Sequence, residues 1–206
     1  MYSVINQYAN EVVASIDHDH VSTYLDLTCN LPGRLGEEAY RRRYRQFWVM
    51  RGLSAHFYES YFQTLAGAQH NHITFRDALE ILHQVPCTQN GSLRVHASFA
   101  SKLCHMCDPR LPIYDNLVAD FFFFERPNYD QNPEGRIVEY ERFYQFLVAE
   151  YDRVIRMGLL AVAIGVFRAQ FPQPGLTDQK VIDSLVWSFV KQLRNGALLN
   201  AQVQLL

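Results

Sequence analysis

The stretch that decides the fold is residues 98–118, which read SFASKLCHMCDPRLPIYDNLV. Its first half continues an apolar stripe at helical spacing, formed by Val95, Phe99, Leu103 and Met106. Asp108-Pro109 ends this helix, because the residue before a proline is driven out of the helical region. Asp115 then stands directly before a second apolar run, in the position of a helix N-cap. The stretch therefore predicts two helices joined by a turn.

The same pattern extends outward over nearly the whole chain. Apolar residues recur three and four positions apart in most segments, and the alternation typical of strands is scarce. We therefore expect an all-α protein, a compact bundle of about eight to ten helices. Residues 1–206 form one helical domain in this interpretation. It allows two lobes around a cleft, residues 1–30 with 137–206 and residues 31–136.

Capping residues set several helix starts. Ser54 is expected to cap a helix that reaches Gly67, and Thr74-x-x-Asp77 resembles a capping box. Thr177 or Asp178 is expected to cap the last helix, which Asn195-Gly196 closes.

Other helix boundaries depend on periodicity and on breaking residues. We expect one helix over residues 2–17 and a short one near 21–28 that ends before Pro32. Another opens at Ser92. Residues 137–171 predict one long helix or two stacked ones, with Gly158 and Gly165 as close-packing points.

The composition limits the class of protein. Of 206 residues, 49% are hydrophobic and 19% charged, which is typical of a folded chain. The net charge of −2 excludes a protein held to nucleic acid or membrane by overall charge alone, but it allows a local basic patch. The most apolar run, residues 157–167, is too short to span a bilayer. We expect a cytoplasmic protein with no membrane association, because no secretory signal is visible.

Cysteines and histidines give no strong metal signal. Cys104 and Cys107 form a C-x2-C pair, but no second pair completes a zinc site, so buried free thiols are expected. The pairs His18-Asp19-His20 and His70-Asn71-His72 are expected to be solvated loop histidines. The sequence therefore predicts no metal and no cofactor.

Arginines gather in residues 34–51. This segment holds six arginines against Glu37 and Glu38, an excess of four positive charges. One interpretation is an edge that contacts nucleic-acid phosphates, with Arg41, Arg42 and Arg45 as the candidate binding residues. The other is a solvated helix face with its own ion pairs. Only three of the 19 basic residues of the chain are lysine, namely Lys102, Lys180 and Lys191.

Lys102 and Asp115 are the candidate chemical pair. Lys102 falls about 60° from the centre of its helix's apolar stripe, at the boundary between core and solvent. A cleft at such a place lowers the pKa of an amine and leaves it nucleophilic. Asp115 follows after a turn that folds the chain back. The simpler alternative is an ordinary ion pair, with Asp115 acting only as a helix cap.

Residues 92–120 resemble the helix-hairpin-helix superfamily of DNA base-excision glycosylases. That family shows a Gly-x-Gly-x-Lys turn opening a helix, which Ser98 to Lys102 matches with Ser98 and Ala100 in place of the glycines. An apolar stretch and a Val-Asp-Thr-x-Val-like segment follow in the family, which Ile113 to Val118 matches.

The resemblance implies DNA as partner and a lysine–aspartate mechanism. Lys102 would attack the sugar C1′ of an extruded nucleotide and form a Schiff base, and Asp115 would stabilise the developing positive charge. The resemblance also implies that Ser98 and Ser101 contact nucleic acid, and that Tyr114 and Asn116 line the substrate pocket.

Two other classes of function stay open. One is a catalytically inactive glycosylase-like module that binds DNA or a protein in a defence or regulatory system. The other is an interaction protein with no nucleic-acid role.

Overall fold

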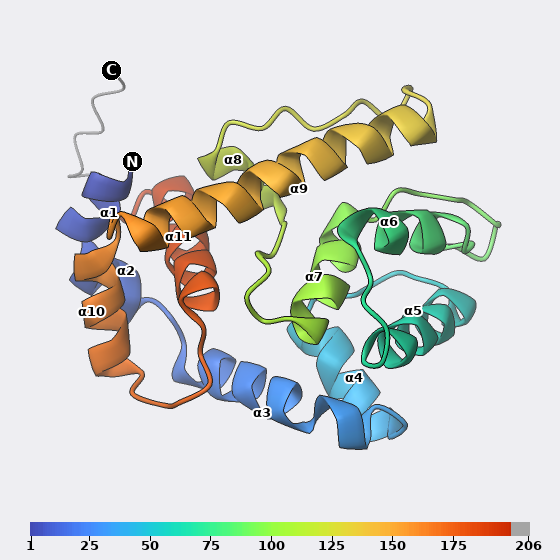
Figure 1. Ribbon diagram of the computed structural model, residues 1–206, viewed down its shortest axis with the longest axis horizontal. Coiled ribbons are helices and arrows are strands. Elements are labelled where there is room, and N and C mark those ends of the chain that lie inside the picture. The colour runs from blue at the N-terminus through green and yellow to red at the C-terminus, as the bar shows by residue number, and fades with distance from the viewer. Residues whose placement is uncertain (199–206) are drawn as a thin grey trace.

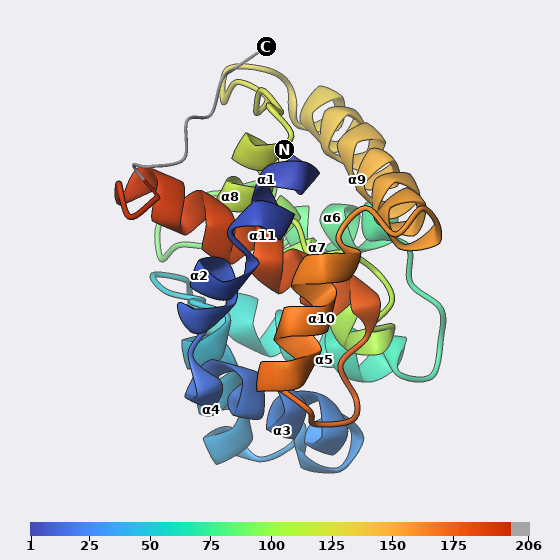
Figure 2. The same cartoon turned by 90° about the vertical axis from the view of Figure 1, so that its left-hand side faces the viewer.

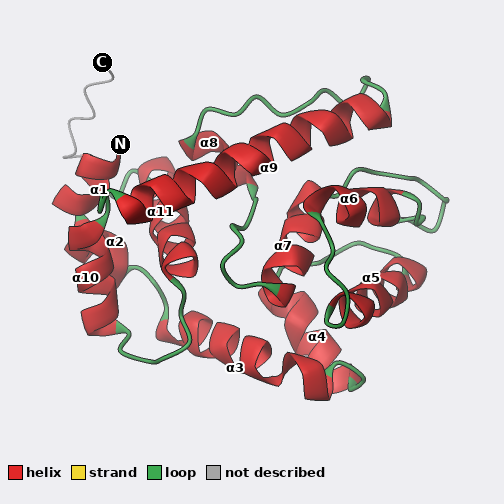
Figure 3. Ribbon diagram, in the orientation of Figure 1, coloured by secondary structure: helices red, strands yellow, loops and turns green. Residues whose placement is uncertain are grey.

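The computed structural model describes residues 1–198, which form eleven α-helices and no strand (Figures 1 and 3). The expected all-α class is confirmed. The helices are α1 (Tyr2–Gln7), α2 (Ala9–Ala14), α3 (His18–Arg34), α4 (Glu38–Phe47), α5 (Ala55–Ala68), α6 (Phe75–His83), α7 (Ala97–Cys107), α8 (Asn116–Phe121), α9 (Pro133–Arg156), α10 (Ala161–Gln170) and α11 (Asp178–Arg194). Among residues 1–198, no helix is both long and apolar enough to cross a membrane.

The helices gather in two groups. Helices α1, α2, α10 and α11 lie at one end of the molecule and α4 to α7 at the other, while α3 and α9 run between them (Figure 1). In Figure 2 the first group faces the viewer, and the N-terminus belongs to it. Helix α11 packs against α2, α8, α9 and α10. This position explains why most of its residues are buried, including Lys180 and Asp183.

The predicted caps are confirmed. The hydroxyl of Ser54 accepts from the Phe57 amide, and Thr74 and Asp77 form a complete capping box. Thr177 caps α11, because its hydroxyl accepts from the Lys180 amide. Gly196, with φ of 69°, follows the last helical turn as predicted.

The first helical segment differs from the prediction. It divides into α1 and α2 at Tyr8, whose φ of −105° leaves the helical region. Pro32 lies inside the last turn of α3, so the prediction that the helix ends before it is wrong. A proline so near the helix end disturbs few further helical hydrogen bonds.

Two later boundaries are also corrected. The Ser92 amide bonds to the Thr88 hydroxyl and its carbonyl accepts from Cys87, so Ser92 belongs to a loop and the helix begins at Ala97. Residues 137–171 contain α9 and α10, separated at Gly158 with φ of 63°. Gly165 is not a close-packing point, because a Cβ there would meet nothing within 4 Å.

Candidate active site

A cavity of about 310 Å³ lies where the two groups of helices meet. Its walls come from the segment after α2, the end of α4, helix α7, the loop before α8, and α11. All three lysines of the chain line it, together with three aspartates: Lys102, Lys180, Lys191, Asp17, Asp115 and Asp183. The cavity therefore collects amines and carboxylates around one partly open space.

Lys102 extends from α7 toward the end of α4. Its Nζ donates to the Trp48 carbonyl at 3.2 Å and lies 5.6 Å from the centre of the Trp48 ring and 5.5 Å from that of Phe99. Burial lowers the pKa of this amine to about 8, although the charges of Asp115 and Asp183 oppose the shift. About a tenth of the amine is therefore unprotonated at pH 7.

Asp115 is both a helix cap and a cavity residue. Its Oδ1 accepts from the Val118 amide at 2.8 Å, which confirms the predicted cap of α8. Burial raises the pKa of its carboxyl, and the charge of Asp183 raises it further. No ion pair joins Asp115 to Lys102 within the described part of the chain. The simpler alternative of a direct Lys–Asp pair is therefore not realised.

Ser101 fixes the turn that brings these two residues together. Its hydroxyl accepts from the Tyr114 amide at 2.9 Å and lies within hydrogen-bond distance of the Ser98 and Tyr114 carbonyls. The residue is completely buried. The expectation that Ser101 contacts nucleic acid is therefore wrong, because a side chain enclosed by its own turn presents no surface. Through these hydrogen bonds, Ser101 connects α7 to the loop that precedes Asp115.

His105 supports the same turn from inside the core. Its Nδ1 lies 2.6 Å from the Leu111 carbonyl and its Nε2 lies 2.7 Å from the Tyr24 hydroxyl. Complete burial lowers the pKa of His105 to about 4, so the ring is neutral. A neutral ring satisfies both contacts when Nδ1 donates to Leu111 and Nε2 accepts from Tyr24.

Helix α11 supplies a second charged pair that the sequence did not single out. The Lys180 Nζ donates to the Asp183 Oδ2 at 2.7 Å, and the two side chains are 6% and 10% exposed. Lys180 also lies 5.1 Å from the centre of the Tyr24 ring. The only sequence signal is a pair of opposite charges three residues apart on an otherwise apolar helix face.

Aromatic rings surround the cavity mouth. His20 stacks on Phe47 with ring centres 4.5 Å apart and lies nearly parallel to Trp187 at 6.3 Å. Lys191 lies over the Trp187 ring at 4.6 Å. The prediction of solvated loop histidines is confirmed for His70 and His72, which are exposed in a loop. His18 and His20 are also exposed, but the loop assignment is wrong for them, because they begin α3.

Ser98, Tyr114 and Asn116 lie on the other side of Lys102. They line a wider hollow of about 740 Å³ that shares Trp48, Val49 and Lys102 with the first cavity. Tyr114 and Asn116 therefore do not line the space between Lys102 and Asp115, as a pocket around that pair would require. The cavity that Lys102 and Asp115 share is walled instead by Ile16, Phe47, Trp48, Ile113 and Trp187.

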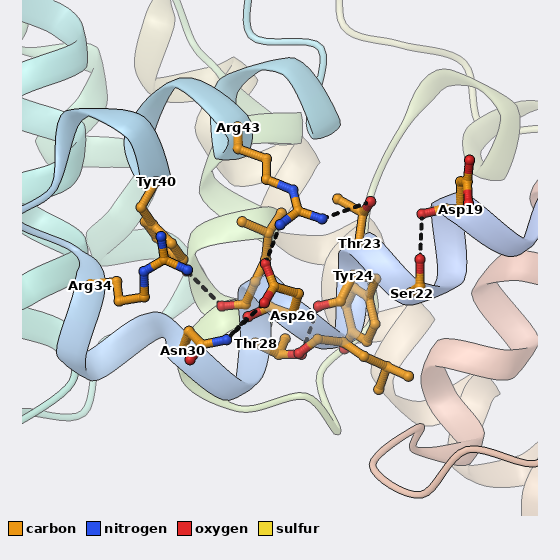
Figure 4. Close-up of polar contacts among 12 residues, drawn as sticks. Asp19, Ser22, Thr23, Tyr24, Asp26, Thr28, Asn30, Arg34, Tyr40 and Arg43 are labelled. Carbon is orange, nitrogen blue, oxygen red and sulfur yellow. Dashed lines mark hydrogen bonds and ion pairs between the residues drawn. The ribbon is translucent and has the colours of Figure 1, made fainter.

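Four of the six arginines of residues 34–51 form ion pairs, two of them with acids of other helices. Arg41 pairs with Glu59 at 2.8 Å and Arg45 with Glu38 at 2.6 Å. Arg43 reaches from α4 to Asp26 on α3 (Figure 4). Arg42 is exposed. These arginines are absent from the lining of the Lys102 cavity as the structure describes it, so the basic cluster and the chemical pair occupy different surfaces.

The cysteines are free, as predicted for Cys104 and Cys107. Burial raises the pKa of the Cys104 thiol to about 12 and that of Cys107 to about 11, so neither is a thiolate at neutral pH. Among residues 1–198, no three His, Cys, Asp or Glu side chains gather as metal ligands.

No family model, curated protein or solved structure matches this chain.

Proposed function

We propose that this protein is a DNA glycosylase with lyase activity, in which Lys102 is the nucleophile and Asp115 its acidic partner. The observation that carries the proposal is the placement of these two residues on one cavity without a direct ion pair between them. The resemblance of residues 92–120 to the helix-hairpin-helix glycosylases assigns the same two residues to the reaction.

The chemistry uses the unprotonated Lys102 amine. Its lone pair attacks C1′ of an extruded nucleotide, the bond from C1′ to the base breaks, and the base leaves with the bonding electrons and takes up a proton. The attacking nitrogen then loses one proton, the C1′–O4′ bond breaks as O4′ takes up a proton, and a protonated Schiff base remains between Lys102 and C1′. Removal of a C2′ proton breaks the C3′–O bond and nicks the strand, and water finally releases Lys102.

Asp115 serves this reaction through its charge and its protons. As a carboxylate it stabilises the positive charge that develops at C1′. Its raised pKa also allows it to accept and return a proton more readily than an exposed aspartate. The cap on α8 holds it in place, because the Val118 amide anchors one carboxylate oxygen.

Borohydride trapping tests the proposal. The protein is incubated with a duplex containing one abasic site, reduced, and analysed by gel and mass spectrometry. We expect a covalent adduct on the peptide containing Lys102, its loss in Lys102→Ala, and at least a tenfold slower reaction in Asp115→Asn, in the range of single catalytic proton-transfer groups. Arg153→Ala, on the far end of α9, is the control and keeps the wild-type rate.

The inactive DNA-binding module is the second candidate, and Ala100 favours it. Ala100 is completely buried within α7, whereas glycine at this place in the family lets the backbone approach a phosphate. Duplex binding without any adduct, unchanged in Lys102→Ala and Asp115→Ala, would support this candidate and overturn the lyase proposal.

A further inference from the structure

We propose that the buried Lys180–Asp183 pair is a positioning element of the cavity, whose charges act across it on the Lys102 amine and the Asp115 carboxyl. The catalytic meaning of this inference rests on the proposed function, but the electrostatic effect exists without any DNA substrate.

The geometry places the pair beside the reactive residues. Lys180 and Asp183 lie about one turn apart on α11, joined at 2.7 Å, and both line the cavity that also holds Lys102 and Asp115. Their side chains are nearly excluded from water, so their fields are weakly screened across that space.

Stability alone gives little reason for such a pair. The desolvation of two buried charges offsets most or all of their mutual attraction, and apolar replacements are often neutral or stabilising. A charged pair on the face that α11 turns toward the cavity is therefore better explained by its effect on neighbouring groups than by its own contribution to folding.

The pair acts on both reactive groups. Asp183 favours the protonated form of Lys102 and so raises the pKa of this amine, while Lys180 lowers it to a smaller extent. Asp183 also raises the pKa of Asp115. Burial lowers the pKa of Lys102, and the Asp183 carboxylate opposes this shift. Burial raises the pKa of Asp115, and the same carboxylate adds to that shift.

The other titratable groups near Lys102 come from four elements. Asp115 caps α8, Asp17 and His20 come from the start of α3, Lys191 from α11, and His105 from α7 itself. The pKa values of His20 and His105 are lowered to about 4, mainly by loss of water around the rings, so both stay neutral where Lys102 titrates. Asp115 and the Lys180–Asp183 pair remain as the charges that act on Lys102.

The scarcity of lysine makes the test direct. With 13C at the ε carbon of lysine, the protein gives only three side-chain signals, which conservative Lys→Arg variants assign. We expect the Lys102 signal to titrate with a midpoint near 8 in the wild type. The midpoint moves to lower pH in Asp183→Asn and to higher pH in Lys180→Gln, because the two variants remove opposite charges.

Asp178→Asn is the matched control. Asp178 is an aspartate on the same helix, 44% exposed and paired with Arg168 outside the cavity. The Lys102 midpoint stays at its wild-type value in this variant. If Asp183→Asn also left the midpoint unchanged, the inference would be overturned, and a shift in the same direction in both aspartate variants would overturn it as well.

A third variant covers the case in which Asp183→Asn fails to fold. Lys180→Gln/Asp183→Asn removes both charges and leaves no unpaired buried ion. Its Lys102 midpoint lies below the wild-type value, because Asp183 has the larger effect of the two. A midpoint at or above the wild-type value would contradict the inference.

The two proposals fail separately. If the Lys102 signal shifts as expected but no variant or wild-type protein forms an adduct, only the glycosylase proposal fails. If an adduct forms and the acid limb of its pH profile is the same in wild type and Asp183→Asn, only the positioning role fails.

Discussion

Lys102 is held in an environment that disfavours its charge. Its amine has one carbonyl partner and two aromatic neighbours, and its pKa is lowered from 10.5 to about 8. Between about pH 8 and pH 10.5, the unfolded chain therefore binds more protons than the folded one. Below pH 8 the charged amine destabilises the fold, and this penalty disappears as the pH rises from about 8 to 10.5.

Replacing this lysine should stabilise the protein. Lys102→Met is expected to raise the free energy of unfolding at pH 7 by up to about 3 kcal/mol, at about 1.4 kcal/mol per pKa unit. Urea unfolding at pH 7 and at pH 10.5 measures the difference, which should vanish at the higher pH. Lys191→Met, at the exposed cavity rim, is the control and changes stability by less than about 0.5 kcal/mol. Equal effects of both variants at both pH values would contradict the prediction.

At the scale of the helices, local side-chain chemistry is predictable and tertiary placement is not. The caps at Ser54, Thr74 and Asp115 follow from hydroxyl and carboxylate groups that bond amides within three residues. The break at Tyr8 follows no local rule.

The same division holds for the candidate site. Lys102 and Asp115 lie close in sequence, so helix periodicity and a turn already bring them together. Lys180 comes from the other end of the chain, and only the packing of α11 into the centre of the molecule brings it to the same cavity. The apolar spacing of α11 predicts that the face carrying Lys180 packs into the core, and Lys180 is buried there in the structure.

Gly158 at the α9–α10 junction and Gly165 inside α10 test the assignment of this boundary. Gly158 has φ of 63°, so Gly158→Ala should lower the free energy of unfolding by about 1–2 kcal/mol. Gly165 is helical and exposed with open space beside it, so Gly165→Ala should raise it by about 0.5–1 kcal/mol. Thermal unfolding of both variants checks the opposite signs. A gain in stability for Gly158→Ala would mean that α9 and α10 form one continuous helix.

At the scale of the whole molecule, four of the six arginines of residues 34–51 form ion pairs with acids. Arg41 and Arg43 pair with acids of neighbouring helices, Arg45 pairs with Glu38 of its own helix, and the net charge is −2. Two acids from outside residues 34–51, Asp26 and Glu59, therefore neutralise half of the excess positive charge of this segment. Nucleic acid would have to compete with ion pairs already formed.

This balance predicts a weak dependence of DNA binding on salt. For an abasic duplex we expect the slope of log K against log salt concentration to be near −3 or shallower, which corresponds to about three neutralised phosphates. Fluorescence anisotropy over a series of KCl concentrations measures it. A slope of about −6 or steeper would show that the paired arginines exchange their carboxylate partners for phosphates.

The distribution of lysine also decides how the protein can be handled. Apart from the amino terminus, every primary amine of the chain lies on the cavity or its rim. Reagents that couple through amines, such as those used to attach proteins to sensor surfaces or fluorophores, would therefore modify the site itself. Attachment through the exposed Cys29 or through an added tag leaves that site open.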